Sequence, residues 1–284
     1  MSRDMLNVLA RAVVLLVLTL SCASLRADLL FRSLEKVDGQ LRWSAVKNYS
    51  NPSDMPYARY ATKGAGVAVE EVRVFVSGNI TREDKLGVDV MADLIATGRQ
   101  KLSGNTVWFA SDGGDIDAAM DMGRLLRRLG VFAVVDKNDQ CMSACVFAFM
   151  GGERRSVAGR LGIHRPFFPH TQDLPDRQVR FRYMQKVLKD YVEEMDFPSS
   201  LYEAVMLVPP ESVRILAAAE LKNFFLDGIS PSSEDLADAA TARHLNLTMV
   251  EYLKRKANAP ACNVLVAANG GCEGRMQGAV PRGR

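Results

Sequence analysis

The chain has 284 residues, of which 48% are hydrophobic and 24% charged, and its formal net charge is +3. This composition excludes collagen-like, low-complexity and strongly disordered proteins, and five cysteines are too few for a dense disulfide framework. The small net charge, carried by scattered basic residues, argues against a partner made of nucleic acid.

The N-terminus has the pattern of a secretory signal peptide. Arg3 and Arg11 precede a short apolar run, and small residues follow the run. The run is far shorter than the ~20 residues that a membrane-spanning helix needs. We expect cleavage after Ala23 or Ala27, with an uncleaved N-terminal membrane anchor as the alternative. The chain is therefore predicted to be exported, either periplasmic or secreted, with no membrane span in the mature chain.

The sequence divides into four segments of different character. The second is polar and rich in turn residues, and the fourth ends in a glycine-rich stretch that we expect to be disordered. The segments are a signal peptide (1–23), an irregular N-terminal lead-in (24–70), the main domain (71–232) and a helical C-terminal extension with a disordered tail (233–284). Cys262 and Cys272 in the last segment are candidates for a disulfide that closes a small loop.

Strands and helices alternate along the main domain. Short runs of β-branched and aromatic residues predict strands, and apolar residues at helical spacing predict helices between them. The expected strands cover 72–76, 106–110 and 131–135, and the expected helices cover 86–96, 116–129 and 176–194. This alternation indicates parallel βαβ units, and therefore an α/β fold class. The stretch from 198 to 257 is expected to be mainly helical.

A turn with two glycines follows the second of these strands. Gly113 and Gly114 allow the backbone to turn tightly and to present N–H groups to a ligand. An ordinary tight turn is the alternative, with Asp115 as the N-cap of the next helix. Asp112, Asp115 and Asp117 lack the spacing of a calcium loop.

The segment 140–145 links the third strand to an apolar helix. A serine at such a turn, here Ser143, can present its hydroxyl to a cleft while the next backbone N–H binds an oxyanion. A simple N-cap serine is the alternative. Cys141 and Cys145 flank Ser143 and are either buried thiols or a short disulfide.

His164 ends a short apolar strand, which directs its side chain out of the sheet edge. A structural histidine is the alternative interpretation of this residue. His164, His170 and Asp173 together could ligate a metal, but no fixed spacing on one face supports such a site. We therefore predict no metal and no cofactor.

The order and spacing of four short motifs resemble the Clp protease proteolytic-subunit/crotonase superfamily. The likeness is greatest to its secreted or periplasmic ClpP-like branch, and it covers about residues 70–230. The motifs are Ser-Asp-Gly-Gly (111–114), Cys-Met-Ser-Ala-Cys (141–145), Gly-Gly-Glu-Arg-Arg (151–155) and Gly-Ile-His-Arg-Pro (162–166). The resemblance implies a crotonase/ClpP-like stacked, twisted sheet with βαβ units and a helical C-terminal part.

The same resemblance implies roles for individual residues. Ser143 matches the nucleophile and His164 the general base, while the backbone N–H groups of Gly114 and Ala144 match the oxyanion hole. A hydroxyl nucleophile needs such a base, and its tetrahedral intermediate needs such donors. Members of the superfamily form trimers or larger rings, so the resemblance also implies a homo-oligomer.

This chain departs from the family pattern at two places. Asp112 replaces the proline that usually precedes the paired glycines and puts a carboxylate near the oxyanion hole. Val213 stands where the family has the acid of the triad, and Glu211 and Asp227 are weak candidate substitutes. A Ser–His dyad without an acid, or Lys137 as the base, are further alternatives.

We therefore expect an exported serine hydrolase, a peptidase acting on a peptide or protein substrate. The first alternative is a catalytically weak or inactive ClpP-like protein used for binding or assembly. An acyl-CoA enzyme of the crotonase type is disfavoured, because export removes the chain from cytosolic CoA. The sequence leaves two uses open for Met184, Leu188 and Tyr191 of the predicted helix 176–194, which either pack within the chain or serve contacts between subunits.

Overall fold

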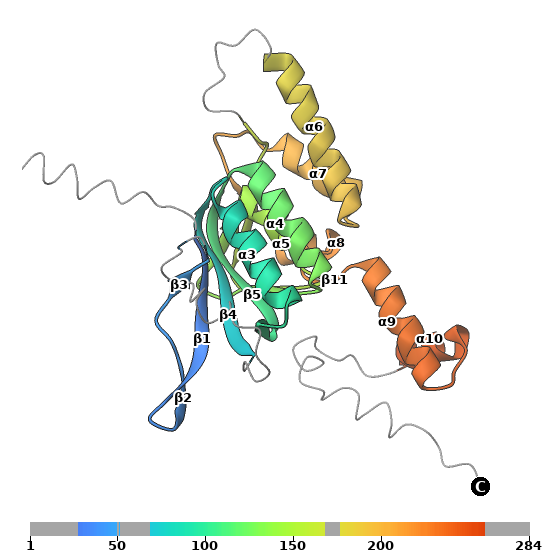
Figure 1. Ribbon diagram of the computed structural model, residues 1–284. Helices are drawn as coiled ribbons and strands as arrows, with labels where there is room; N and C mark the ends of the chain where they lie inside the picture. The colour runs from blue at the N-terminus through green and yellow to red at the C-terminus, as the bar shows by residue number, and fades with distance from the viewer. Residues whose placement is uncertain (1–27, 50, 52–68, 168–176, 259–284) are drawn as a thin grey trace, which may run out of the picture.

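The computed structural model describes residues 28–49, 51, 69–167 and 177–258, and these residues form one sheet covered by helices (Figure 1). The sheet has 11 strands, in the order β10-β9-β7-β5-β4-β1-β2 along its main path. The parallel strands of this path are β4 (Glu70–Ile80), β5 (Gln100–Gly114), β7 (Gln140–Met142) and β9 (Arg160–Ile163). The antiparallel strands at its two ends are β1 (Asp28–Val37), β2 (Gln40–Trp43) and β10 (Arg214–Ile215), and β3 (Lys47–Asn48) pairs with β1.

The sheet divides into two branches beside the long strand β5. The middle of β5 pairs with β6 (Phe132–Val135), which leads to β8 (Arg154–Val157) and β11 (Gly228–Ile229). The part of β5 nearer its C-terminal end pairs with β7, which leads to β9 and β10. The carboxyl ends of β5, β7 and β9 therefore meet at one edge of the sheet.

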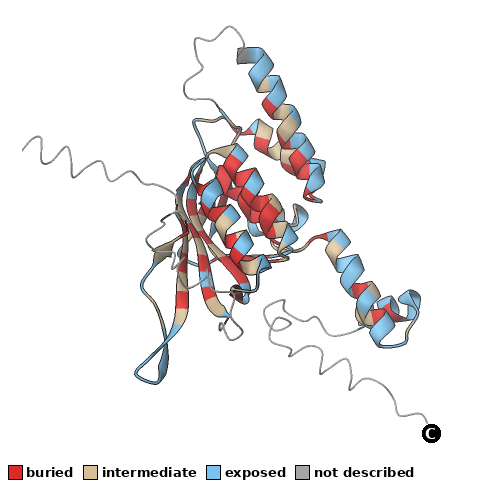
Figure 2. Cartoon of the chain, in the orientation of Figure 1, coloured by how far each residue is buried: buried red, intermediate tan, exposed pale blue. Residues whose placement is uncertain are grey.

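Three helices cover one face of the sheet and bury the core against it (Figures 1 and 2). They are α3 (Asp84–Ala96), α4 (Ile116–Arg128) and α5 (Ala144–Met150). All residues of α5 are buried, because its sequence is apolar on every side. The helix that follows Ser143 is therefore part of the core rather than a surface element.

The C-terminal third is mainly helical, as the sequence predicts. Its helices are α6 (Arg177–Glu194), α7 (Ser199–Leu207), α8 (Ala218–Asn223), α9 (Pro231–His244) and α10 (Met249–Asn258). Asp238 of α9 joins the last two helices through hydrogen bonds from Tyr252 and Lys256 of α10. None of the helices in the described ranges is both long and apolar enough to cross a bilayer.

The α/β class is confirmed, and the predicted strands and helices of the main domain form near their expected positions. The lead-in differs from the prediction, because part of the segment expected to be irregular forms β1, β2 and β3. Alternating residues of β1, such as Leu29 and Phe31, are buried against the core. The signal peptide, Cys262 and Cys272 lie outside the described residues, and the domain boundaries stay predictions.

The apolar face of α6 is packed within this chain. Met184, Leu188 and Tyr191 of α6 are 6%, 0% and 0% exposed. Helical spacing identifies an apolar face, but it does not say whether that face covers the chain's own core or a partner. Of the two uses that the sequence left open, the structure has packing within the chain, and these residues are not free for a subunit contact.

Candidate active site

The residues singled out in the sequence converge where three parallel strands end. Cys141 of β7 pairs with Ser111 of β5 and with Leu161 of β9. The strands run in the same direction, so residues that follow their ends lie at the same edge. Ser143 follows β7 and His164 follows β9, and both side chains are half-buried. The fold thus brings the predicted nucleophile and base to neighbouring positions.

Ser143 has an unusual backbone conformation, with φ 55° and ψ −124°. Residues other than glycine rarely adopt a positive φ, and strain of this kind costs about 1–3 kcal/mol and gathers at functional sites. The Ser143 N–H donates to the carbonyl of Gly162 in β9 (2.9 Å). Ser143 occupies the N-cap position of α5, but its hydroxyl makes no capping hydrogen bond. The hydroxyl is therefore not used as the simple cap that the sequence also allowed.

The two cysteines that flank Ser143 form a disulfide. Cys141 in β7 and Cys145 in α5 are joined, with their Cα atoms 5.3 Å apart, and both residues are buried. The sequence left buried thiols and a short disulfide as alternatives, and the structure has the disulfide.

The paired glycines lie directly against Ser143. Gly113 has φ 108° and Gly114 has φ 136°. A Cβ on Gly113 would lie 2.7 Å from the Cβ of Ser143 and 3.0 Å from the N atom of Ala144. A Cβ on Gly114 would lie 2.0 Å from the carbonyl oxygen of Ile80. Only glycine fits these positions, and the turn forms one wall of the site.

The carboxylate of Asp112 is the end of a chain of side-chain hydrogen bonds, here called the ladder, that the sequence does not predict. The amide of Gln140 in β7 donates to Asp112, and Arg160 in β9 donates to Gln140 (2.6 Å). Asp112 is exposed. Because these residues are far apart in sequence, the ladder follows only from strand pairing.

His164 is oriented by a backbone carbonyl. Its Nδ1 lies 3.0 Å from the carbonyl oxygen of Arg165. A carbonyl oxygen only accepts hydrogen bonds, so we assign the proton to Nδ1, which leaves the lone pair on Nε2. The N–H of Arg165 in turn donates to the carbonyl of Val208 (2.9 Å), which fixes this segment. In the described part of the chain the Ser143 hydroxyl makes no hydrogen bond to His164; such bonds are often long in sites without substrate.

The structure also shows where the candidate acids lie. Arg214 of β10 pairs with Ile163, so the same register places Val213 opposite His164. Glu211 is exposed, and Asp227 accepts a hydrogen bond from the N–H of Val157 in the other branch of the sheet (3.2 Å). No carboxylate in the described ranges contacts the ring of His164.

One further candidate from the sequence, Lys137, is not brought to the site. Lys137 is exposed in the turn that precedes β7, whereas Ser143 follows the other end of this strand. His170 and Asp173 lie outside the described residues. Within those residues no three metal-ligating side chains form a cluster.

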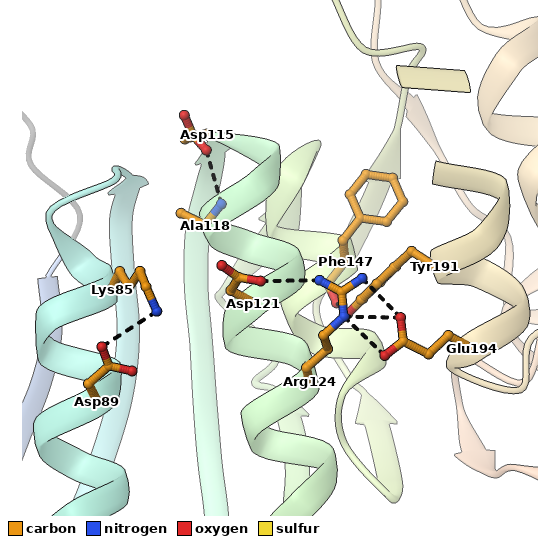
Figure 3. A network of polar contacts seen from close by, with 9 residues as sticks. All are labelled: Lys85, Asp89, Asp115, Ala118, Asp121, Arg124, Phe147, Tyr191 and Glu194. Atoms are coloured by element: carbon orange, nitrogen blue, oxygen red, sulfur yellow. Dashed lines mark hydrogen bonds and ion pairs between the residues drawn. The ribbon is translucent and has the colours of Figure 1, made fainter. Parts of the chain in front are cut away.

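Helix α5, which begins directly after Ser143, is in contact with α6. The hydroxyl of Tyr191 donates to the carbonyl of Phe147 in α5 (2.6 Å), and burial raises the pKa of this phenol. Arg124 of α4 stacks over the Tyr191 ring and binds the carboxylate of Glu194 (2.9 Å) (Figure 3). These contacts connect α4, α5 and α6 on the side away from the sheet.

Replacing Tyr191 by phenylalanine is expected to lower the free energy of unfolding by about 1–2 kcal/mol, because the buried carbonyl of Phe147 loses its donor. Urea denaturation measures this change. Tyr183 is on the same helix but 68% exposed, so Tyr183→Phe is the matched control and should leave the urea midpoint unchanged. Equal midpoints for the two variants would contradict the assigned role.

Comparisons with known proteins give distant structural similarities only. No protein-family model matches the chain, and no curated protein matches it in sequence. The chain is similar to a mutant of the 1510-N membrane-bound stomatin-specific protease, with 13% identity and a TM-score of 0.41 over 54% of this chain and 75% of that one. It is also similar to a mutant of ClpP1 from Listeria monocytogenes, with 15% identity and a TM-score of 0.41 over 54% of this chain and 86% of that one. We therefore base the functional assignment on the residues of this chain.

Proposed function

We propose that the chain is an exported, ClpP-like serine hydrolase that cleaves peptides, with Ser143 as nucleophile and His164 as general base. One observation carries this proposal. A serine in a strained turn, a histidine with its Nε2 lone pair available and a wall of two glycines meet at one sheet edge. Nucleophile, base and backbone donors are the parts that acyl transfer requires.

The proposed reaction begins with attack of the Ser143 hydroxyl oxygen on the peptide carbonyl carbon. His164 Nε2 takes the hydroxyl proton and then gives it to the leaving amine, which yields an acyl-enzyme. A water molecule attacks the acyl-enzyme by the same route and releases the acid. The carbonyl of Arg165 holds Nδ1–H throughout, so it performs the orienting role of a triad acid without its negative charge.

The oxyanion of the tetrahedral intermediate is proposed to bind the N–H groups of Gly114 and Ala144. Ala144 is the first residue of α5, so its N–H has no acceptor within the helix. The N–H of Asp115 bonds to Ile80 on the β4 side of β5 (2.7 Å). Since successive N–H groups of a strand alternate in direction, we infer that Gly114 N–H is directed to the β7 side, toward Ser143.

Export and assembly are also part of the proposal. The Cys141–Cys145 disulfide supports an oxidising compartment, because disulfides are rare in cytosolic proteins. A homo-oligomer rests on the family resemblance alone. A monomeric mass in light scattering of the purified protein would remove that part of the proposal.

A second candidate function is binding or assembly without turnover. Val213 opposite His164 favours this candidate, because it supplies no carboxylate. The neutral carbonyl of Arg165 stabilises an imidazolium less than a carboxylate would. The exposed carboxylate of Asp112 favours it too, because a negative charge near the oxyanion hole opposes the developing oxyanion.

A fluorophosphonate probe separates the two candidates. A hydrolase should be labelled, and the label should be lost in Ser143→Ala and kept in Ser200→Ala, which removes an exposed hydroxyl in α7. Absence of labelling in a folded native protein would favour the binding protein.

Replacing Val213 by aspartate is expected to raise kcat. In serine proteases, loss of the triad acid costs about 10⁴ in kcat, largely because the histidine takes the wrong tautomer. Here the Arg165 carbonyl already fixes the tautomer, so the new carboxylate adds mainly stabilisation of the imidazolium. We expect a gain of about 10-fold, well short of that full factor.

Peptide turnover by Val213→Asp and by the neutral control Val213→Asn tests this expectation. Val213→Asp should raise the rate of peptide turnover and Val213→Asn should not, because only the aspartate carries a charge. High native activity that is abolished by Glu211→Gln would contradict the account, since Glu211 would then already supply the acid.

A further inference from the structure

We propose that the Cys141–Cys145 disulfide is a positioning cross-link that holds Ser143 in its reactive conformation. This inference deepens the proposed function and rests on it. Ser143 is the middle residue of the loop that the disulfide closes, with Cys141 in β7 on one side and Cys145 in α5 on the other. The Cα atoms of the two cysteines are 5.3 Å apart, so the bridge fixes the distance across the turn.

The disulfide is expected to stabilise the fold less than a cross-link over a long loop would. Chain-entropy stabilisation by a cross-link grows with the length of the loop that it closes, and this loop joins residues only four positions apart. Both ends of the loop are also anchored without it. Cys141 pairs with Ser111 and Leu161 in the sheet, and every residue of α5 is buried. The effect of the bridge is therefore expected within the turn itself.

The turn needs such a restraint because Ser143 is strained. A non-glycine residue at φ 55°, ψ −124° keeps this conformation only where its surroundings leave no alternative. The N–H of Ser143 bonds to Gly162 (2.9 Å), its carbonyl accepts from the N–H of Val146 (3.1 Å), and its Cβ lies against Gly113. Without the bridge, relaxation of φ at Ser143 would move its hydroxyl oxygen relative to His164 and to the paired glycines.

The expected consequence is a loss of rate rather than of binding. Misplacing a reacting group by about 1 Å can cost about 10²-fold in rate. The substrate-binding surface outside the turn is unchanged, so KM should stay similar. If the disulfide merely stabilised the fold, its removal would lower the stability and leave kcat per folded molecule unchanged.

The test compares the double variant Cys141→Ala/Cys145→Ala with Val135→Ala. Val135 lies in β6, in the other branch of the sheet, and is 0% exposed, so the variant loses buried volume away from the turn. We expect the double variant to lose about 10²-fold in kcat and in fluorophosphonate labelling rate, with KM changed less than about twofold. Val135→Ala should keep kcat within about twofold even if its Tm falls as much as that of the double variant. Equal kcat losses in both variants, or none in the double variant, would overturn the proposal.

Amide hydrogen exchange gives a readout that does not depend on activity. The amide of Ser143 donates to the carbonyl of Gly162, and the amide of Val146 donates to the carbonyl of Ser143. Both amides should exchange at least about tenfold faster in the double variant, while those of β4 stay unchanged. Unchanged protection at the turn would overturn the proposal even for an active enzyme. If the native protein shows no Ser143-dependent labelling, the proposed function is refuted. Hydrogen exchange at the turn then tests by itself whether the disulfide holds Ser143 in place.

A second route covers the case in which the double variant does not fold. Dithiothreitol reduces the native disulfide by transferring two electrons and two protons, and itself closes to a cyclic disulfide. Mass spectrometry after alkylation verifies that both thiols have formed. The same loss of kcat and of amide protection is expected, and full activity of the reduced protein would contradict the proposal.

Discussion

Replacing His164 by alanine is expected to lower kcat by about 10³-fold, within the range that general acid–base catalysis contributes. Nε2 of this residue is the proposed base, since Nδ1 is bound to the carbonyl of Arg165. Without the imidazole of His164, the Ser143 hydroxyl should keep its proton and attack slowly. The remaining rate would come from substrate binding and the backbone donors.

Peptide hydrolysis by the purified variant measures this loss, and the chain offers a matched control. His244 is an exposed histidine in the last turn of α9, and His244→Ala should keep full activity. Circular dichroism should give the same fold for both variants. Activity that survives His164→Ala would remove the proposed base and would direct attention to another proton acceptor.

Replacing Arg155 by alanine is expected to lower the free energy of unfolding by about 3–5 kcal/mol, as large-to-small core substitutions do. Arg155 of β8 is 0% exposed. Its Nε donates to the carbonyl of Phe225 (2.8 Å), its Nη1 donates to the carbonyl of Gly152, and its guanidinium lies 4.7 Å from the ring centre of Phe197. These carbonyls follow the C-termini of α8 and α5, where the helix dipoles attract a cation.

One effect opposes this loss. Burial, with the nearby guanidinium of Arg127, lowers the pKa of Arg155 to about 9, so the charged form is costly in the folded protein. Alanine removes that cost, but it also leaves a void and two buried carbonyls without donors. We expect the lost packing and hydrogen bonds to outweigh the removal of the buried charge.

Urea denaturation of Arg155→Ala tests this balance against Arg154→Ala, its exposed neighbour on the same strand. The control should shift the free energy of unfolding by less than about 0.5 kcal/mol, as is usual for exposed positions. A similarly small change for Arg155→Ala would show that the buried guanidinium does not hold the helix ends.

The sequence predicted those parts of the site that depend on local patterns. Ser143 was identified because a strand pattern changes to an apolar helix at this residue, and His164 because it ends an apolar run. The glycines 113–114 were identified as a turn for the same reason. Each of these signals lies within a few neighbouring residues, where the period of apolar side chains and turn chemistry are informative.

The contacts between these parts could not be predicted in the same way. The ladder from Asp112 through Gln140 to Arg160 depends on the register of strands that are distant in sequence. The orienting group of His164 is a backbone carbonyl, which any residue at position 165 would provide. The sequence left two uses open for the apolar face of α6, because periodicity does not identify the partner of an apolar surface.

A crystal structure of the protein after reaction with a fluorophosphonate tests the central claim most directly. The phosphorus mimics the tetrahedral carbon of the intermediate, so it reports nucleophile and oxyanion hole together. We predict a bond from phosphorus to the hydroxyl oxygen of Ser143, with a phosphonyl oxygen about 2.7–3.1 Å from the N atoms of both Gly114 and Ala144. An adduct on another residue, or a phosphonyl oxygen turned away from both N–H groups, would contradict the proposed active site.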